Sequence, residues 1–426
     1  MDNQKKAFNL REFVKKKAVK NGAWMYLLQF FNTVVPLLTL PYITRILGTA
    51  EYGIVSIAIN ILGYYQVIVE YGFGMSATRR VALDNKKLDM NKLFTSIIFA
   101  RILLVLICLI FTGGYFFANR NNLEQCICIL IMMVGLLGNC VQLNWLFQGL
   151  QHMKYISIIS MVSRIISVIC IFLFVKSSDD VFLYCLLYSI SPFINGVLGL
   201  IIARIKFKIS FSKVSFEDIW NEIKNGWYVF TTQLSSKVFG AIGITFLGMF
   251  ASHSEVGIYS AIQKIPNIIL LIWAPIGQVI YPICSKRMSD SFFEGKKFVI
   301  KIQKIVMPFF LLGSLLIAIF SKVIVFIMFG ENYISHFYWS IPLLLWLLLS
   351  INNNFLGIQI LLGSGHDKEY SKCFQVGVIC TIVFNLVLIY FFHGNGACIA
   401  PVLSEIVLMI MLRKEIIKIE KVRSSV

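Results

Sequence analysis

The sequence predicts an all-α integral membrane protein with twelve transmembrane helices in two six-helix lobes. Of its 426 residues, 58% are hydrophobic and 14% are charged, and the mean hydropathy is +0.78. Soluble domains are closer to half apolar and a quarter charged. Runs of about 20 apolar residues recur along the whole chain, which is the length that a helix needs to cross the hydrocarbon core of a bilayer.

The chain opens with a basic segment, residues 1–22, which carries seven lysines and arginines. Leu10, Phe13, Val14 and Ala18 recur at helical spacing, which favours an amphipathic helix on the inner membrane surface, although a disordered basic tail fits equally well. No small-residue cleavage site follows it, so we predict no removable signal peptide. The first apolar stretch would itself direct the chain to the membrane.

Twelve apolar stretches follow, long enough at about 1.5 Å per residue to cross a core of about 30 Å with varied tilt. They are Ala23–Thr44, Tyr52–Phe73, Leu93–Phe117, Gln125–Phe147, Ile156–Val175, Val181–Ala203, Trp227–Phe250, Ile258–Ile283, Ile305–Phe329, Trp339–Leu362, Phe374–Phe392 and Ala397–Leu412.

The distribution of positive charge predicts the orientation of these helices. The net charge is +18, which in a soluble protein would suggest a nucleic-acid partner. Here most of the 39 lysines and arginines fall in the termini and alternate loops, as the positive-inside rule requires for cytoplasmic segments. We therefore predict both termini in the cytoplasm and no nucleic-acid binding.

The mid-chain loop, residues 204–226, divides the chain into two lobes, residues 23–203 and 227–412, with a basic tail at 413–426. Ser215-Phe-Glu-Asp218 resembles a capping box and predicts a short surface helix in this linker. The halves also repeat. At an offset of 204, Glu51 and Gly53 fall on Glu255 and Gly257. Six helices per half make this a parallel repeat, related by a pseudo-twofold axis along the membrane normal.

The sequence contains no pattern that indicates an enzyme, a metal site or a cofactor. Gly363-Ser-Gly365 lacks the lysine and hydroxyl residue that end a phosphate-binding loop, and Cys126-x-Cys128 has no partner cluster for zinc. The ten cysteines lie mostly in apolar runs, which favours buried free thiols. The short outer loops leave no room for the outer domain of a polymerase or ligase.

Ionisable residues inside the apolar stretches are the candidate functional residues. Placing a charge at mid-bilayer costs at least about 2.5 kcal/mol, so such groups usually face a watery cavity or an ion partner. Cations outnumber acids, which favours an anionic substrate in a cleft between the lobes. The candidate substrate-binding cations are Arg45, Arg101, Arg164, Lys237, Lys264 and Lys322.

Two further sets complete the predicted site. Glu70 and Glu405 are candidates for ion coupling, or else simply neutralise a nearby cation. Polar and aromatic residues in the same stretches could contact sugars, although hydrogen bonds between helices are the more ordinary role for each. These candidates are Tyr26, Gln29, Asn32, Tyr64, Gln233 and Asn353, with Gln142, Asn144, Asn352 and Asn354 as further members.

The segment Pro36-Leu-Leu-Thr-Leu-Pro-Tyr-Ile-Thr-Arg45-Ile-Leu-Gly48, with Glu51-Tyr-Gly53 and Glu70-Tyr-Gly-Phe-Gly74, resembles the Wzx-type polysaccharide repeat-unit flippases. Val256-Gly257 through Lys264 resembles their eighth span, except that Gln263 stands where the family often has an acid. The resemblance implies the fold of the multidrug/oligosaccharidyl-lipid/polysaccharide exporter superfamily. It implies alternating access of an undecaprenyl-pyrophosphate-linked oligosaccharide, for O-antigen or capsule, from the inner to the outer leaflet.

The same resemblance implies a multi-pass protein of the bacterial cytoplasmic membrane. Its partners would be membrane lipids and the polysaccharide polymerase and chain-length machinery. Two other functions stay open at this point: a cation-coupled small-molecule or drug antiporter of the same fold, and a membrane polysaccharide polymerase or ligase. The excess of cations disfavours the first and the short outer loops disfavour the second.

Overall fold

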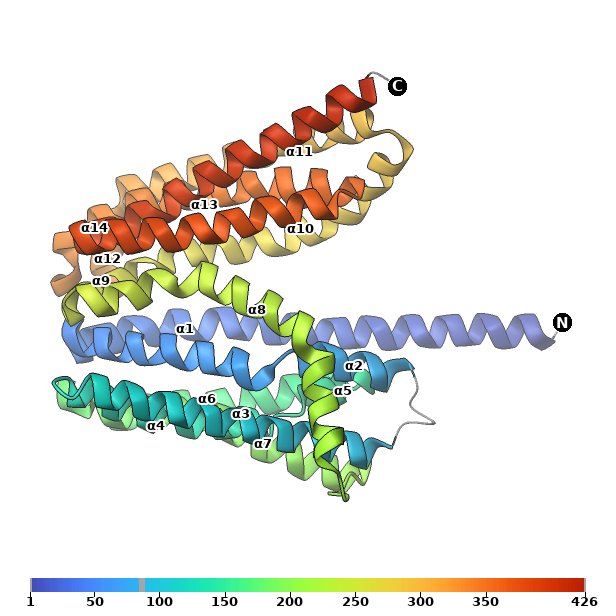
Figure 1. Ribbon diagram of the computed structural model, residues 1–426, viewed down its shortest axis with the longest axis horizontal. Helices are drawn as coiled ribbons and strands as arrows, with labels where there is room; N and C mark the ends of the chain where they lie inside the picture. The colour runs from blue at the N-terminus through green and yellow to red at the C-terminus, as the bar shows by residue number, and fades with distance from the viewer. Residues whose placement is uncertain (1, 84–88, 425–426) are drawn as a thin grey trace. The chain divides into compact units, whose positions relative to one another are not determined.

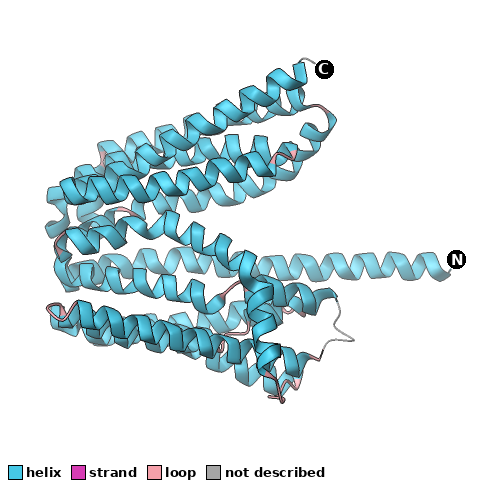
Figure 2. Cartoon of the chain, viewed as in Figure 1, coloured by secondary structure: helices cyan, strands magenta, loops and turns pink. Residues whose placement is uncertain are grey.

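The computed structural model describes residues 2–83 and 89–424, with side chains described from Lys20 onward. Within these residues the chain consists of helices joined by short turns, with no strand (Figure 2). The helices, labelled in Figure 1, are α1 (Asp2–Glu70), α2 (Phe73–Leu83), α3 (Met90–Ala118), α4 (Leu123–Cys140), α5 (Asn144–Gly149), α6 (Met153–Phe174), α7 (Val181–Phe207), α8 (Phe216–Phe250), α9 (His253–Ile262), α10 (Lys264–Asp290), α11 (Phe292–Ile319), α12 (Ser321–Phe329), α13 (Ser340–Asn354) and α14 (Asp367–Ser424). Shorter helical segments are η1 (Ser178–Asp180), η2 (Glu331–Trp339), the π-helix η3 (Phe355–Leu361) and η4 (Leu362–Ser364).

Ten helices in the described part of the chain are long and apolar enough to cross a membrane. Two of these, α1 and α14, each contain two of the twelve predicted stretches. Both turn back at a residue with positive φ, Gly48 (φ 75°, ψ −175°) and His393 (φ 49°, ψ −125°) (Figure 1). The backbone angles at Gly48 are essentially reserved for glycine, which accounts for glycine at the turn between the predicted stretches Ala23–Thr44 and Tyr52–Phe73. The all-α membrane fold is confirmed, whereas the twelve-helix, two-lobe arrangement stays a prediction.

The chain forms two compact units. Unit 1 contains residues 1–39 and 58–237, and unit 2 contains residues 40–57 and 238–426. In unit 1, α7 packs against α4 and α6, and α2 packs against α5. In unit 2, the core gathers large side chains of α10, α11, α13, η3 and α14, among them Trp273, Phe310, Leu347, Phe355 and Leu412. The predicted domain boundaries differ from these units and remain a prediction.

Gly53 and Gly257, which the predicted repeat makes equivalent, lie against each other within unit 2. A Cβ atom on Gly53 would overlap the backbone of His253, and a Cβ on Gly257 would overlap the backbone of Thr49. The hydroxyl of Ser254 donates to the hydroxyl of Thr49 beside them, at 2.8 Å. Only hydrogen atoms fit between these backbones, which accounts for glycine at both positions.

Three predicted stretches are interrupted in the structure. The stretch 125–147 breaks at residues 141–143, between α4 and α5, and the stretch 305–329 breaks at Phe320, between α11 and α12. The stretch 339–362 passes from η2 into α13, then into η3 and η4. The first two interruptions contain no proline or glycine, so the sequence pattern gave no sign of them, whereas η3 contains Gly357.

The predicted linker helix is not a separate element. Ser215 and Asp218 do form a reciprocal cap: the Ser215 amide and hydroxyl donate to the Asp218 carboxylate, both at 2.9 Å, and the Asp218 amide donates to the hydroxyl at 3.2 Å. However, the helix that they start is α8, which continues for 35 residues. Residues 2–22 of the predicted amphipathic segment fall in the first turns of α1, and the side chains of residues 1–19 lie outside those described.

Candidate functional site

Unit 1 contains a polar pocket of about 590 Å³. Six carboxamide side chains, two guanidinium groups and one carboxylate line it, together with a threonine and a tryptophan. A surface of this kind offers many hydrogen-bond donors and acceptors in an otherwise apolar chain. The lining residues are Gln66, Glu70, Gly74, Met75, Thr78, Arg79, Ala82, Arg101, Asn139, Gln142, Asn144, Trp145, Gln148 and Gln233.

The break between α4 and α5 builds one wall of this pocket. Residues 141–143 leave helical geometry, and the next six residues form the short helix α5. A broken helix inside an apolar stretch exposes backbone carbonyls, and these require donors because no bulk water is available at that depth. The same break separates Asn139 and Gln142 from Asn144 and Gln148, and it brings all four amides to the pocket wall.

Arg101, on α3, supplies the missing donor. Its Nη1 lies 3.3 Å from the carbonyl oxygen of Asn139, 3.3 Å from that of Cys140 and 2.6 Å from that of Gln142. The guanidinium also lies 5.9 Å from the centre of the Phe73 ring. The residue is buried, with 4% of its surface exposed. Arg101 therefore holds the broken backbone together, as well as lining the pocket.

Two buried N–H donors among the lining residues have no acceptor in the described part of the chain. They are Nε of Arg101 and Nε1 of Trp145. A buried donor without a partner costs about 1–3 kcal/mol, so such groups are uncommon without a reason. Both donors belong to side chains that line the pocket. A ligand rich in hydrogen-bond acceptors could pair with them there.

The opposite wall comes from the end of α1 and from α2. Tyr71 and Gly72, both with positive φ, separate the two helices after Glu70. The Tyr71 ring stacks on Phe230 of α8, with ring centres 4.3 Å apart. The Thr78 hydroxyl donates to the carbonyl oxygens of Gly74 at 2.5 Å and Trp145 at 3.1 Å, which joins α2 to α5.

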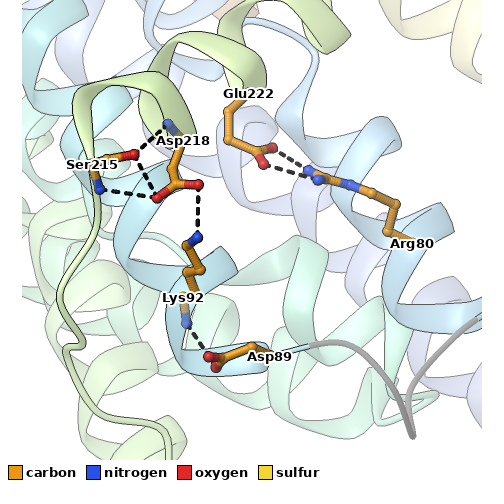
Figure 3. Close-up of polar contacts among 6 residues, drawn as sticks. All are labelled: Arg80, Asp89, Lys92, Ser215, Asp218 and Glu222. Atoms are coloured by element: carbon orange, nitrogen blue, oxygen red, sulfur yellow. Dashed lines mark hydrogen bonds and ion pairs between the residues drawn. The ribbon is translucent and has the colours of Figure 1, made fainter.

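The two consecutive arginines of α2 have different roles. Arg79 lines the pocket. Arg80 forms a two-pronged ion pair with Glu222 of α8, in which both guanidinium Nη atoms donate to the carboxylate (Figure 3). Because Glu222 is only 7% exposed, Arg80 neutralises a buried charge and fixes α2, and hence Arg79, against α8.

A second ion pair fixes the start of α8. Lys92, in the first turn of α3, donates to Asp218 at 2.8 Å, beside the Ser215 cap (Figure 3). Asp218 lies in the charged linker, outside the apolar stretches. The ammonium of Lys92, together with the Ser215 amide and hydroxyl, lowers the pKa of Asp218 to about 2. Its carboxylate is thus kept ionised at all physiological pH values.

Five predicted site residues meet in the pocket: Glu70, Arg101, Gln142, Asn144 and Gln233. The other predicted residues of unit 1 lie outside it. Arg164 donates to the Oδ1 of Asn32 at 2.6 Å. The ammonium of Lys237 lies 5.5 Å from the centre of the Tyr64 ring. Tyr26 and Gln29 are exposed on α1.

The predicted residues of unit 2 are dispersed. Arg45 donates to the carbonyl oxygens of Phe326 at 3.3 Å and Ile327 at 2.6 Å, near the end of α12, where a cation offsets the negative helix end. Lys264 and Lys322 are exposed. Glu405 is buried and accepts a hydrogen bond from Asn353. The six predicted cations are thus not gathered in one pocket of the described structure, and Arg45 and Arg101 are held by backbone carbonyls.

Several lining residues were missed or undervalued by the sequence analysis, chiefly Gln66, Arg79, Asn139 and Gln148. One signal could have found the wall: from residue 139 to 151 the chain carries five amides, an unusual density inside an apolar stretch. Amide side chains compete with helical backbone bonds, so their density could also have indicated the break.

The structure shows no cluster of metal-binding side chains in its described residues. All ten cysteines are free, and eight are buried, as the sequence analysis predicted.

Comparisons with known proteins place this architecture in a family. The family described as "Polysaccharide biosynthesis protein" matches residues 18–288. The Escherichia coli (strain K12) protein named "Putative O-antigen transporter" is 27% identical over 395 residues, which cover 91% of this chain and 93% of that protein.

Two solved structures share the fold. "Lipid II flippase MurJ, inward closed conformation" gives a TM-score of 0.69 at 12% identity, covering 93% of this chain and 87% of that one. An inward-facing multidrug resistance MATE family transporter of the MOP superfamily gives 0.62 at 13% identity, covering 91% and 99%. The predicted resemblance is thereby confirmed: this multi-pass membrane chain belongs to the polysaccharide biosynthesis protein family and has the fold of the exporter superfamily.

Proposed function

We propose that this protein is a flippase that moves undecaprenyl-pyrophosphate-linked oligosaccharide repeat units from the inner to the outer leaflet of the bacterial cytoplasmic membrane. The repeat units would serve O-antigen or capsule synthesis, and transport would proceed by alternating access. The polymerase and chain-length machinery would act on the delivered product. Family membership supports a role in polysaccharide export, and the E. coli relative carries a transporter name.

The observation that carries the proposal is the composition of the unit 1 pocket. The headgroup of a lipid-linked sugar combines an anionic pyrophosphate with many hydroxyls, and its unassisted passage through hydrocarbon would forfeit the hydrogen bonds of all these groups. Arg79 and Arg101 can meet the pyrophosphate, while the six amides can both donate to and accept from sugar hydroxyls. The prenyl chain needs no polar partner and can stay in lipid.

Reconstitution tests this directly. The purified protein is placed in vesicles that contain a dye-labelled polyprenyl-pyrophosphate N-acetylhexosamine, and movement between leaflets is followed by quenching from outside. We expect Arg79→Gln to slow flipping about tenfold, since a hydrogen bond to a charged group contributes about 1.5–3 kcal/mol. The matched control is Arg204→Gln, because Arg204 is exposed at the end of α7 and lies outside the pocket. Equal rates in the two variants, or no flipping by the wild type, would overturn the proposal.

A further inference from the structure

Unit 2 holds an isolated carboxyl group that the proposed binding pocket does not use. Glu405 lies on α14, and only 2% of its surface is exposed. It is twelve residues beyond the break at His393, which corresponds to about 18 Å along the helix. Glu405 is therefore deep within an apolar stretch, where an ionisable residue usually has a functional reason.

The partners of this carboxyl group are neutral. The Nδ2 of Asn353 donates to Oε2 of Glu405 at 2.6 Å and to its backbone oxygen at 2.8 Å. The side chains of Ser350 and Trp346 also form hydrogen bonds with the carboxyl group. None of the four ion pairs in the described part of the chain includes Glu405.

The elements that pack most closely against α14, namely α13 and η3, carry no ionisable side chain in their described residues. The residues that α13 turns toward Glu405 are the neutral ones named above, and the π-helix η3, with sequence FLGIQIL, has no ionisable side chain. The first half of α14 contributes Tyr370, whose phenol is neutral at physiological pH. Helix α9 meets α14 elsewhere: its Glu255 accepts from the amide of Gly394 at 3.4 Å, and its Tyr259 interacts with Cys398.

A chain of hydrogen bonds leads from Glu405 to the side of α11. The Nδ2 of Asn352 donates to Oδ1 of Asn353 at 3.4 Å, and the Nε2 of Gln303 donates to Oδ1 of Asn352 at 2.8 Å. Gln303 is half-buried between the exposed Lys301 and Lys304. Amide hydrogen bonds thus connect Glu405 on α14 with residues of α13 and α11.

Two features could let this arrangement change. The amides of α13 end at η3, and a π-helical turn is an uncommon conformation that often marks a functional site. In addition, Trp346 lines a cavity of about 40 Å³, together with Tyr259, Gln263, Asn385 and Ser404. This cavity, whose lining includes several polar side chains, is large enough for water, which could carry a proton to or from the neighbourhood of the carboxyl group.

We propose that Glu405 is a reversible proton-binding site. The carboxylate takes up one proton to become the neutral acid in the buried arrangement seen here, and it returns that proton when the contacts with α13 open to water. An unpaired carboxylate in such surroundings would carry a large desolvation cost, which binding of a proton removes. The role of this proton in driving headgroup movement rests on the proposed flippase function, whereas proton binding itself does not.

Infrared spectroscopy of the purified protein tests proton binding without any transport substrate. A protonated carboxylic acid has a carbonyl band distinct from that of a carboxylate. We expect this band to disappear as the pH is raised from about 5 to about 9, a range in which exposed carboxyl groups stay ionised. The band should be absent from Glu405→Gln and retained in Glu415→Gln, which alters a less buried glutamate of the same helix.

A band that persists unchanged over the whole range, or that is missing at every pH, would overturn the proposal. If Glu405→Gln fails to fold, Glu405→Asp keeps a carboxyl group and should shift the band instead of removing it. If the carbonyl band kept its frequency in Glu405→Asp, the band would belong to another residue.

Vesicles with a pH difference across the membrane then test the coupling. We expect the gradient to change the wild-type flipping rate several-fold and to leave the rate of Glu405→Gln unchanged. If the pH gradient changed the flipping rates of wild type and Glu405→Gln equally, Glu405 would have no role in coupling proton movement to transport. If the wild type does not flip the labelled lipid at all, the proposed function fails while the spectroscopic result still stands.

Discussion

The polar pocket of unit 1 and the Glu405 network of unit 2 show two ways to keep charge in an apolar chain. In the pocket, the guanidinium of Arg101 is bound by the carbonyls of a broken helix, beside a volume of about 590 Å³. Around Glu405 the partners are neutral side chains, α13 passes into the π-helix η3 just beyond them, and the nearby cavity measures about 40 Å³. Backbone carbonyls thus hold the permanent charge of an open site, whereas neutral side chains surround a carboxyl group in a closed site, where the charge can be neutralised.

Among the variants that test this comparison, Arg101→Ala should have the largest effect. We expect at least about 3 kcal/mol of destabilisation, because three backbone carbonyls lose their donor at about 1–3 kcal/mol each. The melting temperature in detergent and the yield of folded protein should both fall. The variant Arg101→Lys should be intermediate, since an ammonium lacks the planar fork of donors. A fully stable Arg101→Ala would show that the break does not need its cation.

Asn353→Ala should have the next largest effect and should test the closed site. Removing the amide deprives the buried carboxyl group of Glu405 of a hydrogen-bond donor, which lowers the stability by about 1–3 kcal/mol. Thermal unfolding of the purified protein measures this loss. The double variant Asn353→Ala with Glu405→Gln should be less destabilised than the sum of the two single variants. Additive effects would show that the two residues do not act together.

Gln148→Ala tests whether an amide of the unit 1 pocket serves transport and not stability. A neutral hydrogen bond contributes about 0.5–1.5 kcal/mol, so flipping should slow by about two- to tenfold. The melting temperature should be unchanged, because Gln148 is exposed in the pocket wall. Gln375→Ala, at an exposed position of α14, serves as the control. A loss of stability in Gln148→Ala would assign this residue a structural role like that of Arg101.

The smallest effect is expected at Asp218, an ionised group outside both sites. Its pKa is lowered in the folded state, mainly by Lys92 and also by Ser215. Its stabilising contribution is therefore complete above the unfolded pKa, near about 4, and is lost as the pH falls through about 2. Wild type and Asp218→Asn should differ slightly in melting temperature at neutral pH and converge at low pH. A melting-temperature difference that grew as the pH was lowered would contradict this prediction.

The sequence was informative where physical constraints act locally. The turn between the stretches Ala23–Thr44 and Tyr52–Phe73 followed from the end of one apolar run and the start of the next, and the cap at Ser215 followed from hydrogen-bonding chemistry within four residues. The depth of Arg101 and Glu405 followed from counting along apolar stretches. Each of these predictions depends only on neighbours in the chain.

The partner of each deep charge could not be predicted, because it depends on long-range packing. Arg101 is bound by carbonyls that exist only because the chain breaks at residues 141–143, where no proline or glycine marks a break. Lys237 was predicted to belong to a cationic cleft and lies near the ring of Tyr64, far away in the sequence. Gln148 and Gln66 join the pocket through the packing of α5 and α1, which no local pattern records.

The contact between Gly53 and Gly257 has an evolutionary consequence. An oversized side chain in a protein core can often be compensated by trimming its neighbour. Here the neighbour of each glycine is main chain, which no mutation can shorten. A bulky replacement at either position would therefore have no second-site suppressor at its point of collision, and only a shift of a whole helix could restore the fit.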